Sequence, residues 1–463
     1  MFYISTRGSA PALAFDEVLL AGLACDGGLY VPSVWPQVSS VEQVELNNLN
    51  YPDLACRLMF PFVGESIAED DFAEIVSASY SEFTNDQVVP LTKLDDGFWL
   101  LELFHGPTLA FKDIALQLLG RLFDYILTRR GQRITIVGAT SGDTGSAAIE
   151  ACKGRESVNI FILHPAGRVS DVQRRQMTTV SSENVHNIAI NGTFDNCQDL
   201  VKACFNDAHF REQVSLSAVN SINWARIMAQ IVYYFWAGLK LGAPDQGTTF
   251  VVPTGNFGNI FAGYGAHLMG LPVNKLVVAS NQNDILVRFF EKNEMSMEPV
   301  VPTVTPSMDI QVSSNFERLL FDLLERKSGD VSEAMHSFRK TGKLVVPNFA
   351  WKGAKKLFDA NKVDDNTTLG TIAKIYSDKN VLIDPHTAIG VESALQMSSK
   401  LTRPIVSLAT AHPAKFPDAA KKAVGQVPAL PPSLNDLYER KEKFSKLPNQ
   451  LDILQDFIRA KTY

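Results

Sequence analysis

One lysine stands in an apolar setting in the segment HGPTLAFKDIA, residues 105–115. Lys112 follows three apolar residues and precedes an aspartate. Such a lysine either packs its stem along the surface with its ammonium in water, or places its nitrogen in a cleft where it does chemistry. Partial burial disfavours the ammonium and raises the fraction of free amine. Lys112 is therefore a candidate catalytic group, and the rest of the sequence has to decide between the two interpretations.

The segment VGATSGDTGSAA, residues 137–148, follows a predicted strand and opens a predicted helix. Its small residues let successive backbone N–H groups point outward, and a helix N-terminus adds positive potential for an anion. No lysine follows the glycines, so it is not a Walker loop, and the glycines at 138, 142 and 145 do not form a dinucleotide fingerprint. The segment is either an anion-binding loop or a tight strand-to-helix turn.

A second glycine turn lies in PTGNFGNIFAGYG, residues 253–265, again between a predicted strand and a predicted helix. Gly255 and Gly258 allow close backbone approach, while Asn256 and Asn259 can hydrogen-bond to an anion or to the loop itself. Two such loops without a nucleotide signature favour a small phosphorylated cofactor together with an anionic substrate.

A third strand end lies in PIVSLATAHPAKF, residues 404–416. Thr410 ends the predicted strand, where its hydroxyl is placed to hydrogen-bond a ring nitrogen. Taken alone, Thr410 is more simply an ordinary strand-ending threonine.

The elements that carry these residues alternate between apolar strands and helices. The predicted strands are RITIVG, VNIFIL, TTFVVP, KLVVAS and PIVSLA. Continuous apolar strands of this kind are typical of parallel sheets covered on both faces, in an α/β architecture that binds ligands beyond the carboxyl ends of its strands. Before them, FDEVLLAGLACDGGLYVP predicts a short helix ending at Gly27 and Gly28, then a strand. The last residues are polar and predict a pair of surface helices.

The bulk composition narrows the class of protein. A chain of 463 residues exceeds what one hydrophobic core supports, so two or more domains are expected. A net charge of −7 gives no electrostatic reason to expect nucleic acid or an anionic membrane, and no apolar run is long enough for a membrane span. The eight histidines show no metal-ligand spacing, so no metal site is predicted.

The five cysteines form no C-x-x-C pair and are odd in number, which favours a reducing compartment. The first fifteen residues do not read as a signal or transit peptide. We therefore expect a cytoplasmic protein. The polar C-terminal helices indicate no large apolar interface, which favours a monomer over an oligomer.

Taken together, HGPTLAFKDIA, GATSGDTGSAA, PTGNFGNIFAGY and LATAHPAKF resemble the threonine synthases of the longer type found in fungi and many Gram-negative bacteria. The opening YISTRG and FDEVLLAGLACDGGLYVP are similar to the N-terminal domain of that family, so the likeness runs to about residue 420. It implies the tryptophan-synthase-like fold (fold type II) of pyridoxal-phosphate enzymes, with an additional N-terminal domain. We expect that domain at 1–90, a catalytic region of two α/β subdomains with a cleft between them at 91–430, and a C-terminal helical extension at 431–463.

The resemblance also implies an activity. Enzymes of this family are pyridoxal-phosphate-dependent lyases that convert O-phospho-L-homoserine and water to L-threonine and phosphate, by γ-elimination and β-addition of water, as the last step of threonine biosynthesis. Within it, Lys112 is the Schiff-base lysine and Thr410 meets the pyridine nitrogen. The cofactor phosphate is held by Gly255, Asn256, Phe257, Gly258 and Asn259.

The same resemblance assigns the substrate. The substrate carboxylate is bound by the 140–145 loop, through Thr140, Ser141, Asp143 and Thr144. Its phosphate falls to NSINWARIMAQ, residues 220–230, which resembles an S-x-N-x-x-R segment and assigns Ser221, Asn223 and Arg226. A guanidinium suits a phosphate because it donates two hydrogen bonds, although Arg226 could instead cap a helix or pair on the surface. Asp143 stands where many relatives of the wider fold have an asparagine near the cofactor's ring oxygen.

Three alternatives remain open. A serine/threonine dehydratase or another pyridoxal-phosphate lyase would share the chemistry, but the N-terminal region and the context of Lys112 argue against it. A non-catalytic relative that kept the fold would not need Lys112, both glycine loops and Arg226. A nucleotide-binding enzyme lacks its fingerprints here. Among other arginines, Arg7 could approach the cleft, and Arg174 and Arg175 are expected on a solvated helix face.

Overall fold

The computed structural model describes residues 1–140, 142–217 and 220–462. Ser141, one of the predicted substrate residues, lies outside them. The chain divides into two compact units. Unit 1 comprises Met1–Ala78, Phe83–His105 and Ser221–Pro428, and unit 2 comprises Ser79–Glu82, Gly106–Asn220 and Ala429–Tyr463.

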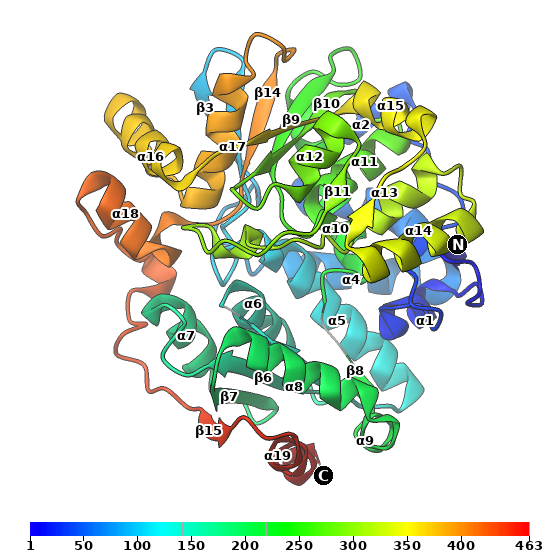
Figure 1. The fold of residues 1–463 in the computed structure, drawn as a ribbon, viewed down its shortest axis with the longest axis vertical. Coiled ribbons are helices and arrows are strands. Elements are labelled where there is room, and N and C mark those ends of the chain that lie inside the picture. Colours follow the sequence, from blue (N-terminus) through cyan, green and yellow to red (C-terminus); the bar gives the residue numbers. More distant parts are fainter. Residues whose placement is uncertain (141, 218–219, 463) are drawn as a thin grey trace. The chain divides into compact units, whose positions relative to one another are not determined.

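Unit 1 contains a six-stranded sheet of order β13-β10-β9-β14-β4-β3 (Figure 1). The strands are β13 (Phe358–Lys362), β10 (Val273–Ser280), β9 (Thr248–Pro253), β14 (Ile405–Ala409), β4 (Phe98–Glu102) and β3 (Leu91–Asp95). All neighbours are parallel except β3 and β4. Every residue of β9 and β14 is buried, as in a sheet covered on both faces. Helix α17 (Pro385–Gln396) packs against both of these strands.

The N-terminal region of unit 1 is mainly helical. Its elements are β1 (Tyr3–Ser5), α1 (Phe15–Ala21), β2 (Tyr30–Pro32), α2 (Ser40–Leu46), α3 (Tyr51–Val63), η1 (Gly64–Ser66) and α4 (Glu69–Tyr80). The prediction that the first helix ends at Gly27 and Gly28 is wrong. It ends before Gly22, which takes a left-handed φ of 64° and donates back to Val18 O, so the chain leaves the helix five residues earlier.

The remaining elements of unit 1 surround its sheet. They are α10 (Trp224–Lys240), α11 (Gly258–Leu268), α12 (Ile285–Lys292), β11 (Met295–Ser296), η2 (Pro306–Met308), α13 (Phe316–Leu323), α14 (Ser328–Thr341), β12 (Lys343–Leu344), α15 (Asn348–Leu357), α16 (Asp365–Lys379), η3 (Pro413–Lys415) and α18 (Pro417–Val424). Helix α10 is buried along nearly its whole length, so it is a core helix without a solvent face. Trp224, at its start, packs against Tyr3, Trp35 and Phe62.

Unit 2 contains a parallel sheet of order β15-β7-β6-β5-β8. Its strands are β15 (Ser445–Pro448), β7 (Val185–Asn191), β6 (Val158–Pro165), β5 (Ile134–Ala139) and β8 (Leu216–Ser217). Its helices are α5 (Lys112–Arg130), α6 (Asp143–Cys152), α7 (Asp171–Thr178), α8 (Phe194–Asn206), α9 (Ala208–Gln213), η4 (Pro432–Leu434) and α19 (Leu451–Thr462). Where the sequence predicted a helical C-terminal extension, strand β15 pairs with β7 before helix α19 begins.

The five strands predicted from apolar runs are all present as β5, β6, β9, β10 and β14, and they are parallel to their neighbours, so the predicted α/β architecture is confirmed. The three turns singled out in the sequence follow the carboxyl ends of β5, β9 and β14. Among the described residues, no helix is long and apolar enough to cross a membrane.

Candidate active site

Lys112 is the first residue of helix α5, and the loop before it is tightly held. Asp113 is completely buried and accepts hydrogen bonds from Thr108 N (2.8 Å) and Thr108 Oγ1 (2.6 Å). Leu109 takes a left-handed φ of 62°, which is unusual for a residue with a side chain, and packs against Val172. The strained backbone is stabilised by this packing, so the loop presents Lys112 in one defined position.

The Lys112 side chain is mostly buried, with 12% exposed, and pairs with Asp143 at 3.7 Å between Nζ and Oδ2. The other carboxylate oxygen of Asp143 accepts from Gln173 Nε2 at 2.9 Å, and Ser170 Oγ donates to Gln173 Oε1 at 2.9 Å. Lys112 is therefore not a surface lysine. The carboxylate beside it attracts the ammonium and orients it.

The 140–145 loop uses part of its backbone for its own closure. Thr140 Oγ1 accepts from both Gly142 N and Gly145 N at 2.9 Å. A Cβ on Gly145 would lie 2.4 Å from Thr140 Cγ2, so glycine is required there for the close approach. Thr140 thus shapes the loop, while Asp143 and the partly exposed Thr144 begin helix α6.

In unit 1, the 255–259 loop turns sharply into helix α11. Phe257, its N-cap, takes a left-handed φ of 63° and is buried among aromatic rings, of which Phe316 is an edge contact at 5.4 Å. A Cβ on Gly255 would lie 2.8 Å from Ser307 O. Strain of this kind persists only where the surroundings over-determine it, and it is concentrated at ligand-binding turns.

Asn259 presents an unused donor at the start of α11. Its Oδ1 accepts from Tyr233 OH (2.5 Å) and Tyr234 OH (2.9 Å), which orients the amide. Its Nδ2 is buried and has no hydrogen-bond partner among the described residues. A buried donor without a partner loses its hydrogen bonds to water and gains none in the protein. This atom is therefore suited to donate to a ligand oxygen.

Arg226 also buries donor atoms without a partner in the described part of unit 1. It lies in the first turn of α10 with 4% exposed, and its Nε and Nη1 atoms are buried without a partner in the described part of the chain. Burial lowers the pKa of Arg226 to about 10. Neither a helix cap nor a surface pair accounts for it, so both alternatives from the sequence are wrong. A buried, unpaired guanidinium requires an anion.

Within the protein, Asn223 uses its side chain and Ser221 uses its backbone carbonyl. Asn223 is the N-cap of α10, where its Oδ1 accepts from Ala225 N (3.0 Å) and its Nδ2 donates to Leu19 O (2.8 Å). Ser221 O accepts from Asn315 Nδ2 at 3.1 Å. Asn223 therefore fixes the start of the helix that carries Arg226.

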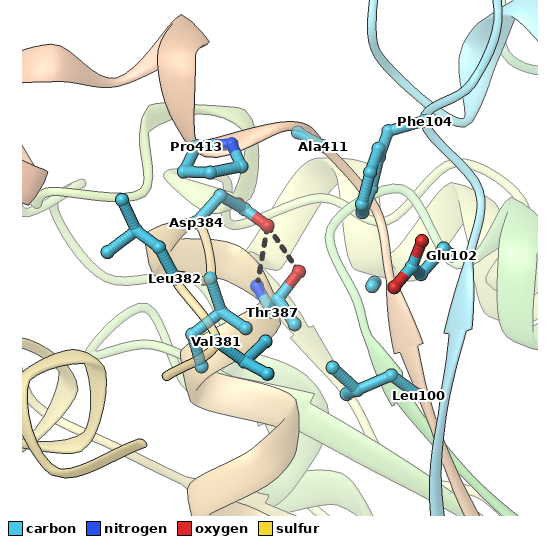
Figure 2. Close-up of a pocket in the computed structure, with 11 residues that line it drawn as sticks. Leu100, Glu102, Phe104, Val381, Leu382, Asp384, Thr387, Ala411 and Pro413 are labelled. Carbon is cyan, nitrogen blue, oxygen red and sulfur yellow. Dashed lines mark hydrogen bonds between the residues drawn. The ribbon is translucent and has the colours of Figure 1, made fainter. Parts of the chain in front are cut away.

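Thr410 follows strand β14, and its backbone N–H donates to Thr387 Oγ1 at 3.2 Å. Thr387 in turn donates to the buried carboxylate of Asp384, which also accepts from Thr387 N and from both His386 N and His386 Nδ1. Figure 2 shows Asp384 and Thr387 joined in this way beside Ala411 and Pro413. The Asp384 carboxylate thus stabilises the strand end on which Thr410 lies.

The residues present fit pyridoxal phosphate. The 255–259 loop supplies a strained glycine turn, a helix N-terminus and the free Nδ2 of Asn259 for a phosphate. Unit 2 supplies a mostly buried lysine beside a carboxylate. Arg226 remains as a site for a further anion.

Sequence reasoning missed Gln173, Tyr233, Tyr234, Thr387 and Asp384, which orient predicted residues. Only Asp384 carried a sequence signal, as the N-cap before a proline at the first position of α17. Arg7 does not present a free guanidinium to a ligand, because it donates twice to Glu317 (3.0 and 2.9 Å).

Comparisons with known proteins cover the whole chain. The family model "Threonine synthase N terminus" matches residues 2–80, "Pyridoxal-phosphate dependent enzyme" matches 84–346, and "Threonine synthase, C-terminal" matches 387–458. A threonine synthase from Pseudomonas aeruginosa is 57% identical over 459 residues, covering 99% of this chain and 98% of its own.

Solved structures agree. A threonine synthase from Brucella melitensis with bound pyridoxal phosphate matches with a TM-score of 0.98 at 51% identity, over 100% of this chain and 99% of its own. The threonine synthase from Escherichia coli matches with a TM-score of 0.81 at 29% identity, over 99% and 100%. The predicted fold, fold type II with an additional N-terminal domain, is confirmed. The chain belongs to the threonine synthase family of pyridoxal-phosphate-dependent enzymes.

Proposed function

We propose that the chain converts O-phospho-L-homoserine and water to L-threonine and phosphate. The observation that carries this proposal is that two sets of buried donors without a partner in the described part of unit 1, at Asn259 and at Arg226, lie on the segments predicted to bind anions. One phosphate belongs to the cofactor, and the second set calls for a substrate that is itself an anion at that end. A dehydratase acting on serine or threonine needs only the first.

Pyridoxal phosphate, when bound, supplies an electron sink for the substrate's Cα. Lys112 holds the cofactor in the resting enzyme, and its amine, once released by the substrate, moves protons at Cα, Cβ and Cγ. Asp143 and Gln173 orient Lys112 for these transfers, since the Asp143 carboxylate lies between them. Thr410 would offer a neutral hydroxyl to the ring nitrogen of the bound cofactor, and a neutral group would not enforce a protonated pyridine.

Arg226 binds the phosphate of the substrate and retains it as it leaves Cγ, after which water adds at Cβ. Because the guanidinium is already desolvated, no water has to rearrange around it when charge develops on the leaving oxygen. The 140–145 loop, with Thr140, Ser141, Asp143 and Thr144, receives the carboxylate where helix α6 begins. The residues that would hold the cofactor phosphate are Gly255, Asn256, Phe257, Gly258 and Asn259.

The cell compartment and assembly state belong to the same proposal. We expect the enzyme in the cytoplasm, acting on a small molecule without nucleic acid or membrane, and as a monomer. Gel filtration with light scattering at several concentrations checks the last point, because a self-associating chain would increase in mass with concentration.

The test is the visible spectrum of the purified protein, recorded before and after O-phospho-L-homoserine is added, with phosphate release assayed in parallel. We expect a cofactor band that shifts on addition, with phosphate released, and the loss of both in Lys112→Ala. Lys153→Ala is the matched control, because Lys153 pairs with Glu150 on the partly exposed surface of unit 2. A cofactor band without phosphate release would overturn the proposed substrate, and no band would overturn the role of Lys112.

A further inference from the structure

A buried asparagine connects the two anion-binding segments of unit 1. Asn315 is fully buried, and its Nδ2 donates to Ser221 O at 3.1 Å and to Asn256 O at 3.0 Å. Its backbone N–H also donates to Asn256 O, at 3.1 Å. One side-chain amide therefore holds the loop that precedes Asn259 and the segment that precedes Arg226.

Arg318 secures that asparagine. This arginine is also fully buried, and its Nη1 donates to Asn315 Oδ1, which fixes the amide orientation. Its Nη2 donates to Ile222 O at 2.5 Å, and its guanidinium lies 5.8 Å from the ring centre of Trp224. Both contacts are with the segment that leads into Arg226, so Arg318 ties that segment to Asn315, which in turn holds the 255–259 loop.

Burying the Arg318 guanidinium costs desolvation free energy that packing alone would not require. Burial lowers the pKa of Arg318 to about 9, because its donors reach neutral carbonyl and amide oxygens and the nearby Glu317 carboxylate only partly opposes the effect. An apolar pair of similar volume would fill the same space without desolvating a charge. What an apolar pair could not do is hold two separate backbone segments in a fixed register through directional hydrogen bonds.

We propose that Asn315 and Arg318 are positioning residues that couple the two anion sites, so that a phosphate at Arg226 strengthens the hold of the 255–259 loop on the cofactor phosphate. The inference rests on the proposed function, because it takes Arg226 as the second phosphate site. An anion that orders one segment also orders the shared amide, and the other site then has less conformational freedom to lose on binding. Coupling of this kind acts equally in both directions.

The experiment uses the holoenzyme with inorganic phosphate as the probe. With the cofactor in place, its phosphate site is occupied, so added phosphate has only the Arg226 site to bind. Calorimetry measures that binding, and timed desalting measures the rate at which the protein loses its cofactor, with and without saturating phosphate at matched ionic strength. We expect phosphate to slow cofactor loss about fivefold or more, because a typical coupling is of that size and differences in affinity lie mostly in dissociation rates.

Three variants separate the causes. Asn315→Ala should still bind both anions but lose most of the phosphate effect on cofactor release. Asn187→Ala is the matched control, since it removes a buried amide that donates to Met177 O at 2.9 Å in unit 2, and it should keep the full effect. Arg226→Gln should abolish phosphate binding to the holoenzyme.

The outcomes are distinct. Phosphate binding that leaves the rate of cofactor loss unchanged in the native protein overturns the coupling and leaves the Arg226 assignment standing. A native holoenzyme that binds no phosphate overturns the Arg226 assignment and the coupling with it. If Asn315→Ala does not fold, the native protein alone decides the coupling, and equal effects in Asn315→Ala and the native protein would overturn the role of Asn315.

Discussion

Arg226 and Asn259 of unit 1 bury donor atoms that have no partner among the described residues, whereas Lys112 and Asp143 of unit 2 are paired with each other. The two sets are buried to a similar degree, so burial does not explain the difference. It lies in what surrounds the groups. Unit 1 brings no carboxylate to Arg226 within ion-pair distance in the described part of the chain, while unit 2 brings Asp143 to Lys112.

The difference between unpartnered donors in unit 1 and a paired lysine in unit 2 corresponds to two tasks, ligand binding and proton transfer. Donors that stay unsatisfied until a ligand arrives are preorganised. Their desolvation lowers the stability of the fold and does not add to the barrier of the reaction. A lysine that must release one partner and take another needs a partner in each state, because an isolated buried charge is costly. In the proposed mechanism, unit 1 therefore supplies the phosphate receptor and unit 2 the proton-transfer group.

The strongest test of the receptor is Arg226→Met. We expect the Michaelis constant for O-phospho-L-homoserine to rise about a hundredfold, since two hydrogen bonds to a charged group contribute about 3 kcal/mol. The cofactor-free protein should become more stable to heat, because an unpaired buried charge is replaced by an apolar side chain. Steady-state kinetics and thermal unfolding measure the two effects.

The control for this substitution is Arg155→Met in unit 2. Arg155 is a partly buried arginine that donates to Ala151 O at 2.7 Å and pairs with Asp124. Its replacement should lower stability and leave the Michaelis constant unchanged. A fall in stability in Arg226→Met, with an unaltered Michaelis constant, would contradict the assignment of Arg226 as a receptor.

The second test is Asp143→Asn, which removes the charge beside Lys112 and keeps an oxygen for Gln173. We expect kcat to fall between about tenfold and a hundredfold, because Lys112 loses the group that orients it, with little change in the Michaelis constant. Asp124→Asn is the control, since Asp124 pairs with Arg155 in the same unit. An unchanged kcat in Asp143→Asn would mean that the pairing has no part in proton transfer.

Much of the fold was predictable because apolar strands have a simple signature. The five predicted strands are continuous apolar runs, and all are present. Strands β7 and β13 were missed because VHNIAIN and FDANK mix polar residues into short runs, and their place is decided by pairing with neighbours already in the sheet. The first helix was predicted too long because Gly22 resembles any helical glycine until its φ is known.

The candidate site was predictable only in its loops. Glycine spacing marks the 140–145 and 255–259 turns, but the side chains that orient them come from elsewhere in the sequence. Gln173 reaches Asp143 across thirty positions, and Asn315 reaches Asn256 across fifty-nine. Arg174, predicted on a solvated face, is 24% exposed and also pairs with Glu442, a contact that the prediction did not include. Contacts of this range leave no periodic signal in the sequence.

A smaller effect on activity and stability is expected from Thr387→Val. This substitution tests whether hydrogen bonds within unit 1 hold the strand end that carries Thr410. Valine keeps the shape but leaves Thr410 N without its acceptor and Asp384 without one donor. We expect a stability loss of about 1–3 kcal/mol and a shift of the cofactor band, because the strand end carrying Thr410 relaxes. Thr387→Ser should restore both in urea unfolding and in the visible spectrum, and a failure of serine to restore them would argue for packing alone.

The smallest effect concerns pH and the C-terminal segment of unit 2. Glu442 accepts from Arg174 Nε at 2.8 Å and from Thr178 Oγ1 at 2.7 Å, and the Arg174 guanidinium lowers the pKa of Glu442 from its ordinary 4.5 to about 2. A carboxylate with a lowered pKa in the folded state stabilises the fold above the unfolded pKa, and this contribution is lost as pH falls through the folded one. Glu442→Gln should therefore be less stable than the native protein at pH 6, with the difference shrinking between pH 4.5 and 2.

Denaturant unfolding at stepped pH measures this difference, and added salt should reduce it. Glu439→Gln is the control, because Glu439 is an exposed acid in the same segment and its replacement should give no such pH-dependent difference. A difference between Glu442→Gln and the native protein that stays constant down to pH 2 would show that the ion pair does not hold the segment. The Glu442–Arg174 pair would then not support the contrast with unit 1, which would rest on the pairing of Lys112 with Asp143.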